Sequence, residues 1–253
     1  MIIYGKSGVT FAKDLFFGEG EGKTTDWEKA KEEGMKLVED YLNTFSGLKD
    51  WLNNTKKSAY KKGYVETMFG RRRRLPDLKS SIHYIRADAE RQAINAPIQG
   101  TGSDFTLRSI IEIMDWLEKS NMKSRLVGTV HDSLVFDIYI PEMHIVAPKV
   151  KHIMEHVHEP YIDSPVPIKA DMELGDSYGG VFDVELEEVQ AIHTKADFED
   201  WLHTKKVEKY TKEIEFFKKK GKPVKELLDY MARNNRPIEE LKNKIVEIYS
   251  KKE

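Results

Sequence analysis

The sequence predicts an α+β protein in which long helical segments surround one β-hairpin. Three stretches, residues 24–62, 83–120 and 144–158, have the composition and periodicity of helices. Two runs rich in β-branched residues, 125–130 and 134–140, flank the polar triplet His131-Asp132-Ser133 and are typical of a hairpin with a polar tip. At 253 residues and 40% hydrophobic, the chain is long enough for one large domain or two modest ones.

Local signals set the expected limits of each element. Thr25 and Asp26 are N-cap candidates for residues 24–62, and Gly47 is expected to interrupt this segment. An apolar stripe expected to be buried recurs there every three or four residues: Met35, Val38, Tyr41, Leu42 and Phe45. The remaining expectations are two short helices within residues 1–18, a strand over 63–70, breaks at Pro97 and Gly100 in the helix of 83–120, and a strand over 166–174.

Composition excludes several classes of protein. The chain has no cysteine, so it has neither disulfides nor thiolate metal sites, and it fits a reducing cytoplasm. No apolar run approaches the roughly 20 residues of a membrane helix, and we expect no membrane partner. The net charge of −2 argues against nucleic-acid binding, but the basic run Arg71–Arg74 shows that charge is unevenly distributed.

The segment from Glu90 to Gly100 carries the strongest functional pattern. Arg91, Asn95 and Gln99 are four residues apart, so on a helix they share one face. A polar row of this kind is more often a solvated surface. Three long donors in register can also contact the DNA minor groove, which offers N3 and O2 acceptors at every base pair whatever the sequence.

Two further segments have a functional and a plain interpretation. Asp132 would be held rigidly between two strands, as a metal ligand requires, although His131-Asp132 alone is usually turn chemistry. Four adjacent arginines usually form an exposed basic loop, and contact with a DNA backbone is the alternative.

Together these segments resemble DNA polymerases of family A, the bacterial polymerase I family, from residue 1 to about residue 180. The strongest matches are Glu90–Gly100, similar to ERxAxNxPxQG, and Val130–Phe136, similar to the VHDELVF of motif C. The other matching segments, in order, are residues 2–7 at the end of the fingers helix, 45–51, 63–76, which contain GYVET and GRRR, and 166–171 in the last palm strand.

The resemblance implies a polymerase palm with an antiparallel sheet and packed helices. Residues 1–62 would hold the end of the fingers helix and the helices after it, residues 63–183 the palm with the motif C hairpin, and residues 184–253 a charged helical extension. The implied activity is template-directed addition of deoxynucleoside triphosphates to a primer, with two Mg²⁺ ions. The implied roles are Asp132 as metal ligand, His131 beside the primer terminus, Tyr4 and Gly5 at the incoming nucleotide, Arg91, Asn95 and Gln99 at the minor groove, and Arg71 and Arg72 at the DNA backbone.

Two departures from the family pattern matter. Ser133 stands where motif C usually has a glutamate, so the site loses one carboxylate. The sequence also starts partway through the fingers helix, without motif A and its aspartate or the residues that clamp the triphosphate. Asp104 and Asp137 are the nearest other carboxylates, and packing or capping is the expected role of both.

Three hypotheses follow. The chain is one part of a split polymerase, such as a bacteriophage encodes, with a partner chain that supplies motif A; or it is a non-catalytic DNA-binding module; or it is a structural remnant. Residues 184–253 are expected to form a small helical appendage packed on the palm. A docking element for the partner is the alternative.

Overall fold

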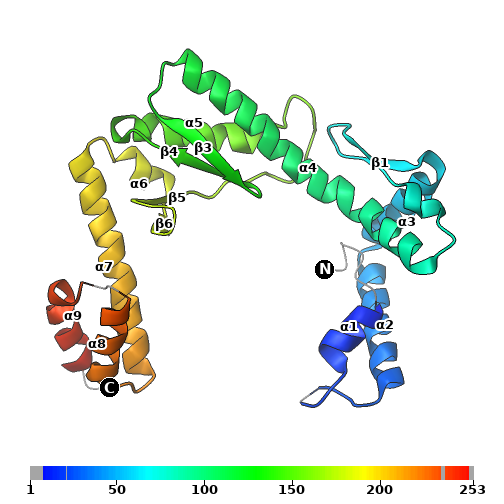
Figure 1. Ribbon diagram of the computed structural model, residues 1–253, viewed down its shortest axis with the longest axis horizontal. Coiled ribbons are helices and arrows are strands. Elements are labelled where there is room, and N and C mark those ends of the chain that lie inside the picture. The colour runs from blue at the N-terminus through cyan, green and yellow to red at the C-terminus, as the bar shows by residue number, and fades with distance from the viewer. Residues whose placement is uncertain (1–7, 21, 235–236, 251–253) are drawn as a thin grey trace. The chain divides into compact units, whose positions relative to one another are not determined.

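The computed structural model describes residues 8–20, 22–234 and 237–250, which are mostly helical with three small two-stranded sheets (Figure 1). The described residues form two compact units that interleave along the sequence. The first contains the described residues up to Glu112 together with 128–135 and 156–167. The second contains 113–127, 136–155 and 168–250. No described helix combines the length and the hydropathy needed to cross a membrane.

In the N-terminal segment, glycine residues let two helices pack closely. It consists of α1 (Gly8–Phe11), a π-helical turn (Ala12–Phe16), α2 (Trp27–Thr44) and α3 (Ser46–Lys62). The Asp26 carboxylate caps the N-terminus of α2. Its Oδ1 accepts hydrogen bonds from the backbone amides of Glu28 and Lys29 at 3.0 and 3.3 Å. A Cβ at Gly34 would lie 2.4 Å from the carbonyl oxygen of Gly8, so only glycine lets α1 approach α2 this closely.

Two expectations for this segment are wrong. The apolar stripe is only partly buried: Val38, Tyr41 and Leu42 are half-buried. Met35 is 55% exposed, and Phe45, which follows α2, is 51% exposed. The buried residues of α2 are instead Ala30 and Gly34, which face α1 and its π-helical turn. The helices separate at Phe45, whose φ of −109° and ψ of 68° are not helical, and Gly47 lies inside α3.

The arginine run forms an unexpected strand. β1 (Tyr64–Glu66) pairs antiparallel with β2 (Arg72–Arg74), and Gly70 supplies a φ of 82° in the connecting turn. The expected strand over 63–70 is therefore shorter than predicted. Val65 and Leu75 lie with residues of α3 and α4 in a buried cluster, so one face of this sheet is covered. A 3₁₀ turn (Pro76–Lys79) leads into α4.

Helix α4 (His83–Lys119) is unbroken at Pro97 and Gly100, where an interruption was predicted (Figure 1). A proline within a helix removes one N–H and crowds the preceding turn. Here the turn of residues 67–71 lies against the helix and adds bonds of its own. The hydroxyl of Thr101 donates to the carbonyl oxygen of Pro97 and accepts from the amide of Met68 at 3.0 Å. Tertiary contacts therefore hold the helix together where the local sequence favours a break.

Arg71 joins this turn to α4. Its Nε donates to Oδ1 of Asp104 at 2.7 Å, and its Nη2 donates to the carbonyl oxygen of Gly100 at 3.0 Å. The Asp104 side chain is 9% exposed, whereas that of Arg71 is 55% exposed. A Cβ at Gly100 would lie 2.6 Å from Cγ2 of Thr67, so glycine admits the turn at this point. Asp104 thus has the packing role expected of it.

The next hairpin consists of β3 (Arg125–Val130) and β4 (Ser133–Asp137), which form one two-stranded sheet (Figure 1). It confirms the predicted hairpin, although β4 ends at Asp137 and not at residue 140. Glu142 holds its base. The carboxylate accepts from the amides of Lys123 and Ser124 at 2.9 Å each and from the Ser124 hydroxyl at 2.9 Å. Ser124 Oγ accepts in turn from the amide of Tyr139 at 3.0 Å, so both strands are joined below the tip.

Helix α5 (Met143–His156) follows a 3₁₀ turn (Ile140–Glu142). The strand expected over 166–174 is largely absent, because residues 166–172 are not in a strand. A short pair, β5 (Glu173–Gly175) and β6 (Val181–Asp183), lies there instead. The single antiparallel sheet expected of a palm is thus represented, in the part of the chain described, by separate two-stranded sheets.

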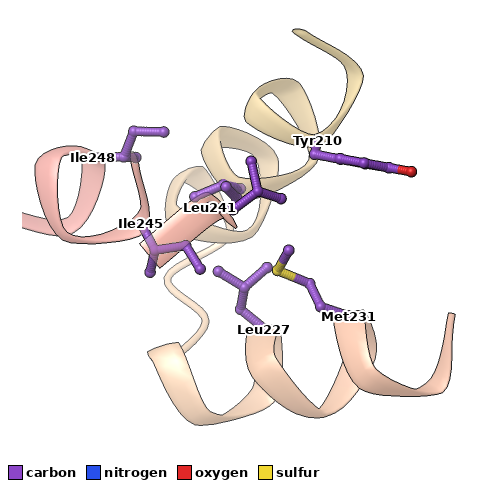
Figure 2. Packing of buried hydrophobic residues seen from close by; sticks show 7 residues of the cluster. Tyr210, Leu227, Met231, Leu241, Ile245 and Ile248 are labelled. Atoms are coloured by element: carbon purple, nitrogen blue, oxygen red, sulfur yellow. The ribbon is translucent and has the colours of Figure 1, made fainter. Parts of the chain in front are cut away.

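The C-terminal helices contribute to two apolar clusters of the second unit. Residues of α6 (Leu186–Gln190) and of the start of α7 (Lys195–Lys219), including Val189 and Trp201, pack with Met143 of α5 and Leu174 of β5. Farther along, α7, α8 (Val224–Arg233) and α9 (Ile238–Ser250) enclose a second cluster (Figure 2). Its buried members are Tyr210, Ile214, Leu227, Met231, Leu241, Ile245 and Ile248.

We expect Arg71→Ala to lower the free energy of unfolding by about 1–3 kcal/mol, because it leaves the nearly buried Asp104 carboxylate without its guanidinium. Water already screens part of this half-exposed pair, which places the loss below that of a fully buried one. Urea denaturation followed by circular dichroism measures it. Arg74→Ala is the matched control. Its exposed side chain has no partner among the described residues, and we expect a change within about 0.5 kcal/mol. Equal effects of the two variants would contradict the role of Arg71.

The hydrogen bonds that Glu142 accepts at the base of the hairpin predict that stability depends on pH. Burial raises the pKa of Glu142, but the bonds from Lys123 and Ser124 outweigh it and hold the pKa below its ordinary value. A carboxyl group whose pKa is lower in the folded state stabilises the fold at pH values above its ordinary pKa. This contribution is lost as the pH falls through the lowered pKa. Glu142→Gln should therefore melt at a lower temperature than the wild type at neutral pH, with the difference vanishing in acid. A difference that does not change with pH would show that the charge of Glu142 is irrelevant.

Candidate nucleic-acid and metal-binding site

Helix α4 carries the predicted polar row on one continuous face. Since the helix is unbroken through Pro97, Arg91, Asn95 and Gln99 keep their spacing of four residues, and the row spans about 12 Å. Arg91 and Gln99 are exposed and Asn95 is half-buried. Oδ1 of Asn95 is buried without a hydrogen-bond partner among the described residues. A row of this length matches three to four base pairs at about 3.4 Å each.

Arg91 has an anionic neighbour that the sequence patterns did not reveal. Its Nη2 donates to Oδ1 of Asp88 at 2.7 Å, and Nε2 of Gln92 donates to the other carboxylate oxygen at 2.7 Å. Gln92 accepts in turn from Nη2 of Arg73 at 2.9 Å. The bonds from Gln92 and Arg91 hold the pKa of Asp88 below its ordinary value. The spacing of three residues between Asp88 and Arg91 was the available signal in the sequence.

The arginine run is mostly engaged within the chain. Arg71 binds Asp104, as described above. Nε of Arg72 donates to Glu66 at 2.8 Å, and its guanidinium lies 4.8 Å from the ring centre of Tyr64. Arg73 reaches Gln92, and Arg74 is the member of the run for which the described residues supply no partner. The predicted DNA contacts of Arg71 and Arg72 would have to use the donors that these bonds leave free.

The β3–β4 turn exposes His131 and Asp132. His131 has a φ of 56°, in the left-handed region that tight turns use and that histidine and aspartate tolerate better than most residues. The hydroxyl of Thr129 donates across the hairpin to the carbonyl oxygen of Ser133 at 3.1 Å. The Asp132 carboxylate is exposed and has no hydrogen-bond or ion-pair partner in the described parts of the chain. The turn therefore presents a carboxylate that is free to bind a ligand.

The carboxylate of Asp132 suits one position in a magnesium site, since Mg²⁺ takes oxygen ligands and typically one or two carboxylates. It does not make a complete site. The residues that the structure describes contain no group of three or more histidine, aspartate or glutamate side chains able to hold a metal ion. Asp104 is committed to Arg71, and Asp137 lies at the far end of β4. Ser133 adds no charge.

Asp132 and the polar row of α4 both belong to the first unit, but no described hydrogen bond or ion pair joins them. Tyr4 and Gly5, predicted to lie at the incoming nucleotide, fall outside the described residues.

Comparison with known proteins agrees with the motifs. The sequence profile described as DNA polymerase family A matches residues 1–180. A DNA polymerase of Bacillus phage SP01 is 38% identical over 218 residues, which are 84% of this chain and 23% of the phage protein. DNA polymerase I of Bacillus subtilis is 35% identical over 148 residues, which are 58% of this chain and 16% of that protein. The chain thus spans less than a quarter of the length of either relative.

A solved structure gives the corresponding match in three dimensions. The POL domain of Pol1 from M. smegmatis, in complex with DNA primer-template and dNTP, superimposes with a TM-score of 0.57 at 31% sequence identity. The match covers 66% of this chain and 27% of that one. With the family profile matched over residues 1–180 and the fold shared with a polymerase domain, the chain belongs to DNA polymerase family A.

Proposed function

We propose that this chain forms the C-terminal part of the polymerase domain of a DNA-directed DNA polymerase, and that it acts together with a separate polypeptide. The observation that carries the proposal is the exposed Asp132 carboxylate at the turn of the β3–β4 hairpin, which has no partner among the described residues. Nucleotidyl transfer by the two-metal mechanism needs more than one carboxylate anchor. The described residues contain no group of three or more histidine, aspartate or glutamate side chains able to hold a metal ion. A partner carrying motif A and the triphosphate clamp would complete the site.

The proposed reaction extends a primer. The 3′-hydroxyl of the primer attacks the α-phosphorus of a deoxynucleoside triphosphate, a P–O bond forms, and the bond to the departing pyrophosphate breaks. Asp132 would hold Mg²⁺, which when bound lowers the pKa of the attacking hydroxyl and neutralises charge on the leaving oxygens. His131 would lie beside the primer terminus, and Tyr4 with Gly5 beside the incoming nucleotide.

The α4 row would bind the newly formed duplex. Arg91, Asn95 and Gln99 carry donors that suit the N3 and O2 acceptors of the minor groove, which every correct base pair presents in the same place. Contacts of this kind bind any sequence and weaken when a mispair displaces the acceptors. The relative solved in complex with DNA primer-template and dNTP supports this ligand class.

The match to the phage polymerase supports a phage-type enzyme working in a bacterial cytoplasm. It covers 84% of the chain, more than the family profile matched over residues 1–180, and so extends into the C-terminal helices. The packing of α6 and α7 against α5 and β5 supports a structural role for the start of that extension.

A non-catalytic DNA-binding module is the second candidate, favoured by Ser133 and by the lack of a metal-binding side-chain group among the described residues. Primer extension separates the two. The chain is assayed with Mg²⁺ and all four deoxynucleoside triphosphates, alone and after mixing with a polypeptide that carries motif A and the triphosphate clamp. We expect extension only in the mixture. Duplex binding without extension in any mixture would favour the non-catalytic module, and extension by the chain alone would show that the second anchor lies within it.

Asp132→Ala should lower the rate of primer extension by the assembled enzyme about a thousandfold or more, because several kcal/mol of charge stabilisation depend on the metal. Affinity for primer-template DNA, measured by fluorescence anisotropy, should change by less than about threefold. Asp137→Ala, at the other end of β4, is the control and should retain the wild-type rate. Extension by Asp132→Ala at close to the wild-type rate would remove Asp132 from the metal site.

A further inference from the structure

Asp88 lies within the helix face that we propose binds DNA, where a negative charge opposes binding. It is exposed, and residues 88, 91, 95 and 99 follow one another along that face at helical spacing. Phosphate repels a carboxylate, so an aspartate in this position needs a compensating role.

The carboxylate of Asp88 connects α4 with the arginine strand. One oxygen binds Arg91, the other binds Gln92, and Gln92 also accepts from Arg73 of β2. An isolated surface ion pair contributes little, whereas charges joined in a network with short bonds hold their geometry. Both bonds to Asp88 measure 2.7 Å. Arg91 therefore bonds to one oxygen of a carboxylate whose other oxygen is held by Gln92, and Gln92 links that carboxylate to the neighbouring strand.

We propose that Asp88 is a positioning residue that holds Arg91 for the minor groove and suppresses the non-specific attraction of this face for phosphate. The guanidinium has five N–H donors, and the bond to Asp88 leaves others for a base or sugar acceptor. The negative charge of Asp88 offsets the positive charge of Arg91, so the guanidinium attracts DNA phosphates less strongly than an unpaired arginine would. Binding at this point then depends on whether the acceptors of a correct pair are in place. The inference rests on the proposed function, because it requires this face to meet the duplex.

The test compares the full chain with Asp88→Asn by fluorescence anisotropy on labelled primer-templates, across a series of salt concentrations. Each protein is titrated with a matched duplex and with one whose terminal pair is mismatched. We expect Asp88→Asn to bind the matched duplex about threefold to tenfold more tightly at low salt, with the slope of log affinity against log salt steeper by about one. Its preference for the matched over the mismatched terminus should fall severalfold.

Two further variants make the readout specific. Asp88→Glu keeps the charge and should restore the wild-type salt slope. Asp115→Asn removes a carboxylate that binds Lys119 at 2.7 Å farther along α4, and should alter neither the slope nor the preference. If Asp88 only stabilised the fold, Asp88→Asn would change the affinity for the matched and the mismatched duplex by the same factor.

Unchanged affinity, slope and preference in Asp88→Asn, or weaker binding of both duplexes, would overturn the assignment of Asp88 while leaving the proposed function intact. A wild-type chain that binds no duplex at all, even when mixed with the polypeptide that carries motif A, would overturn the proposed function and, with it, this inference.

Discussion

The candidate site depends on the continuity of α4 through Pro97. A break there would rotate Gln99 away from Arg91 and Asn95, and the polar row would no longer form one face. Continuity comes from outside the helix. The turn of residues 67–71 bonds to Thr101, to the carbonyl oxygen of Gly100 and to the nearly buried Asp104. The turn that connects the two strands of a small sheet thus preserves the geometry of a helix face that we propose binds DNA.

The β3–β4 hairpin also combines a base held by polar contacts with an exposed tip that carries the side chain proposed to act. Glu142 and Ser124 join the two strands below the tip, and the tip presents Asp132 without an internal partner. An unpaired carboxylate costs little while it is exposed to water, and it remains available to a cation. Both predicted functional elements are therefore held by buried or networked polar contacts, while the side chains proposed to act lie at the surface.

Sequence reasoning identified the elements whose signals are local. The N-cap at Asp26, the hairpin around His131-Asp132 and the helical row of Arg91, Asn95 and Gln99 follow from spacing of residues a few positions apart. The errors have a common physical cause. Pro97 and Gly100 were read as breaks because the bonds that compensate them come from residues about 30 positions earlier. The α2 stripe was predicted to be buried from periodicity, which does not show which face a neighbouring helix covers; Gly34 decides that face through a backbone contact. The role of Asp88 has only a weak local signal, its spacing of three residues from Arg91, which many surface pairs on helices share.

The central claim is that α4 reads the minor groove through acceptors that all base pairs share. The most direct measurement uses primer-template duplexes in which one purine at a time carries carbon in place of N3, titrated with the chain by fluorescence anisotropy. The account predicts loss of affinity at three or four consecutive pairs, the number that a row of about 12 Å spans, and no loss at pairs beyond them. Equal affinity for every substituted duplex would contradict it and would leave the polar row of α4 as a solvated surface.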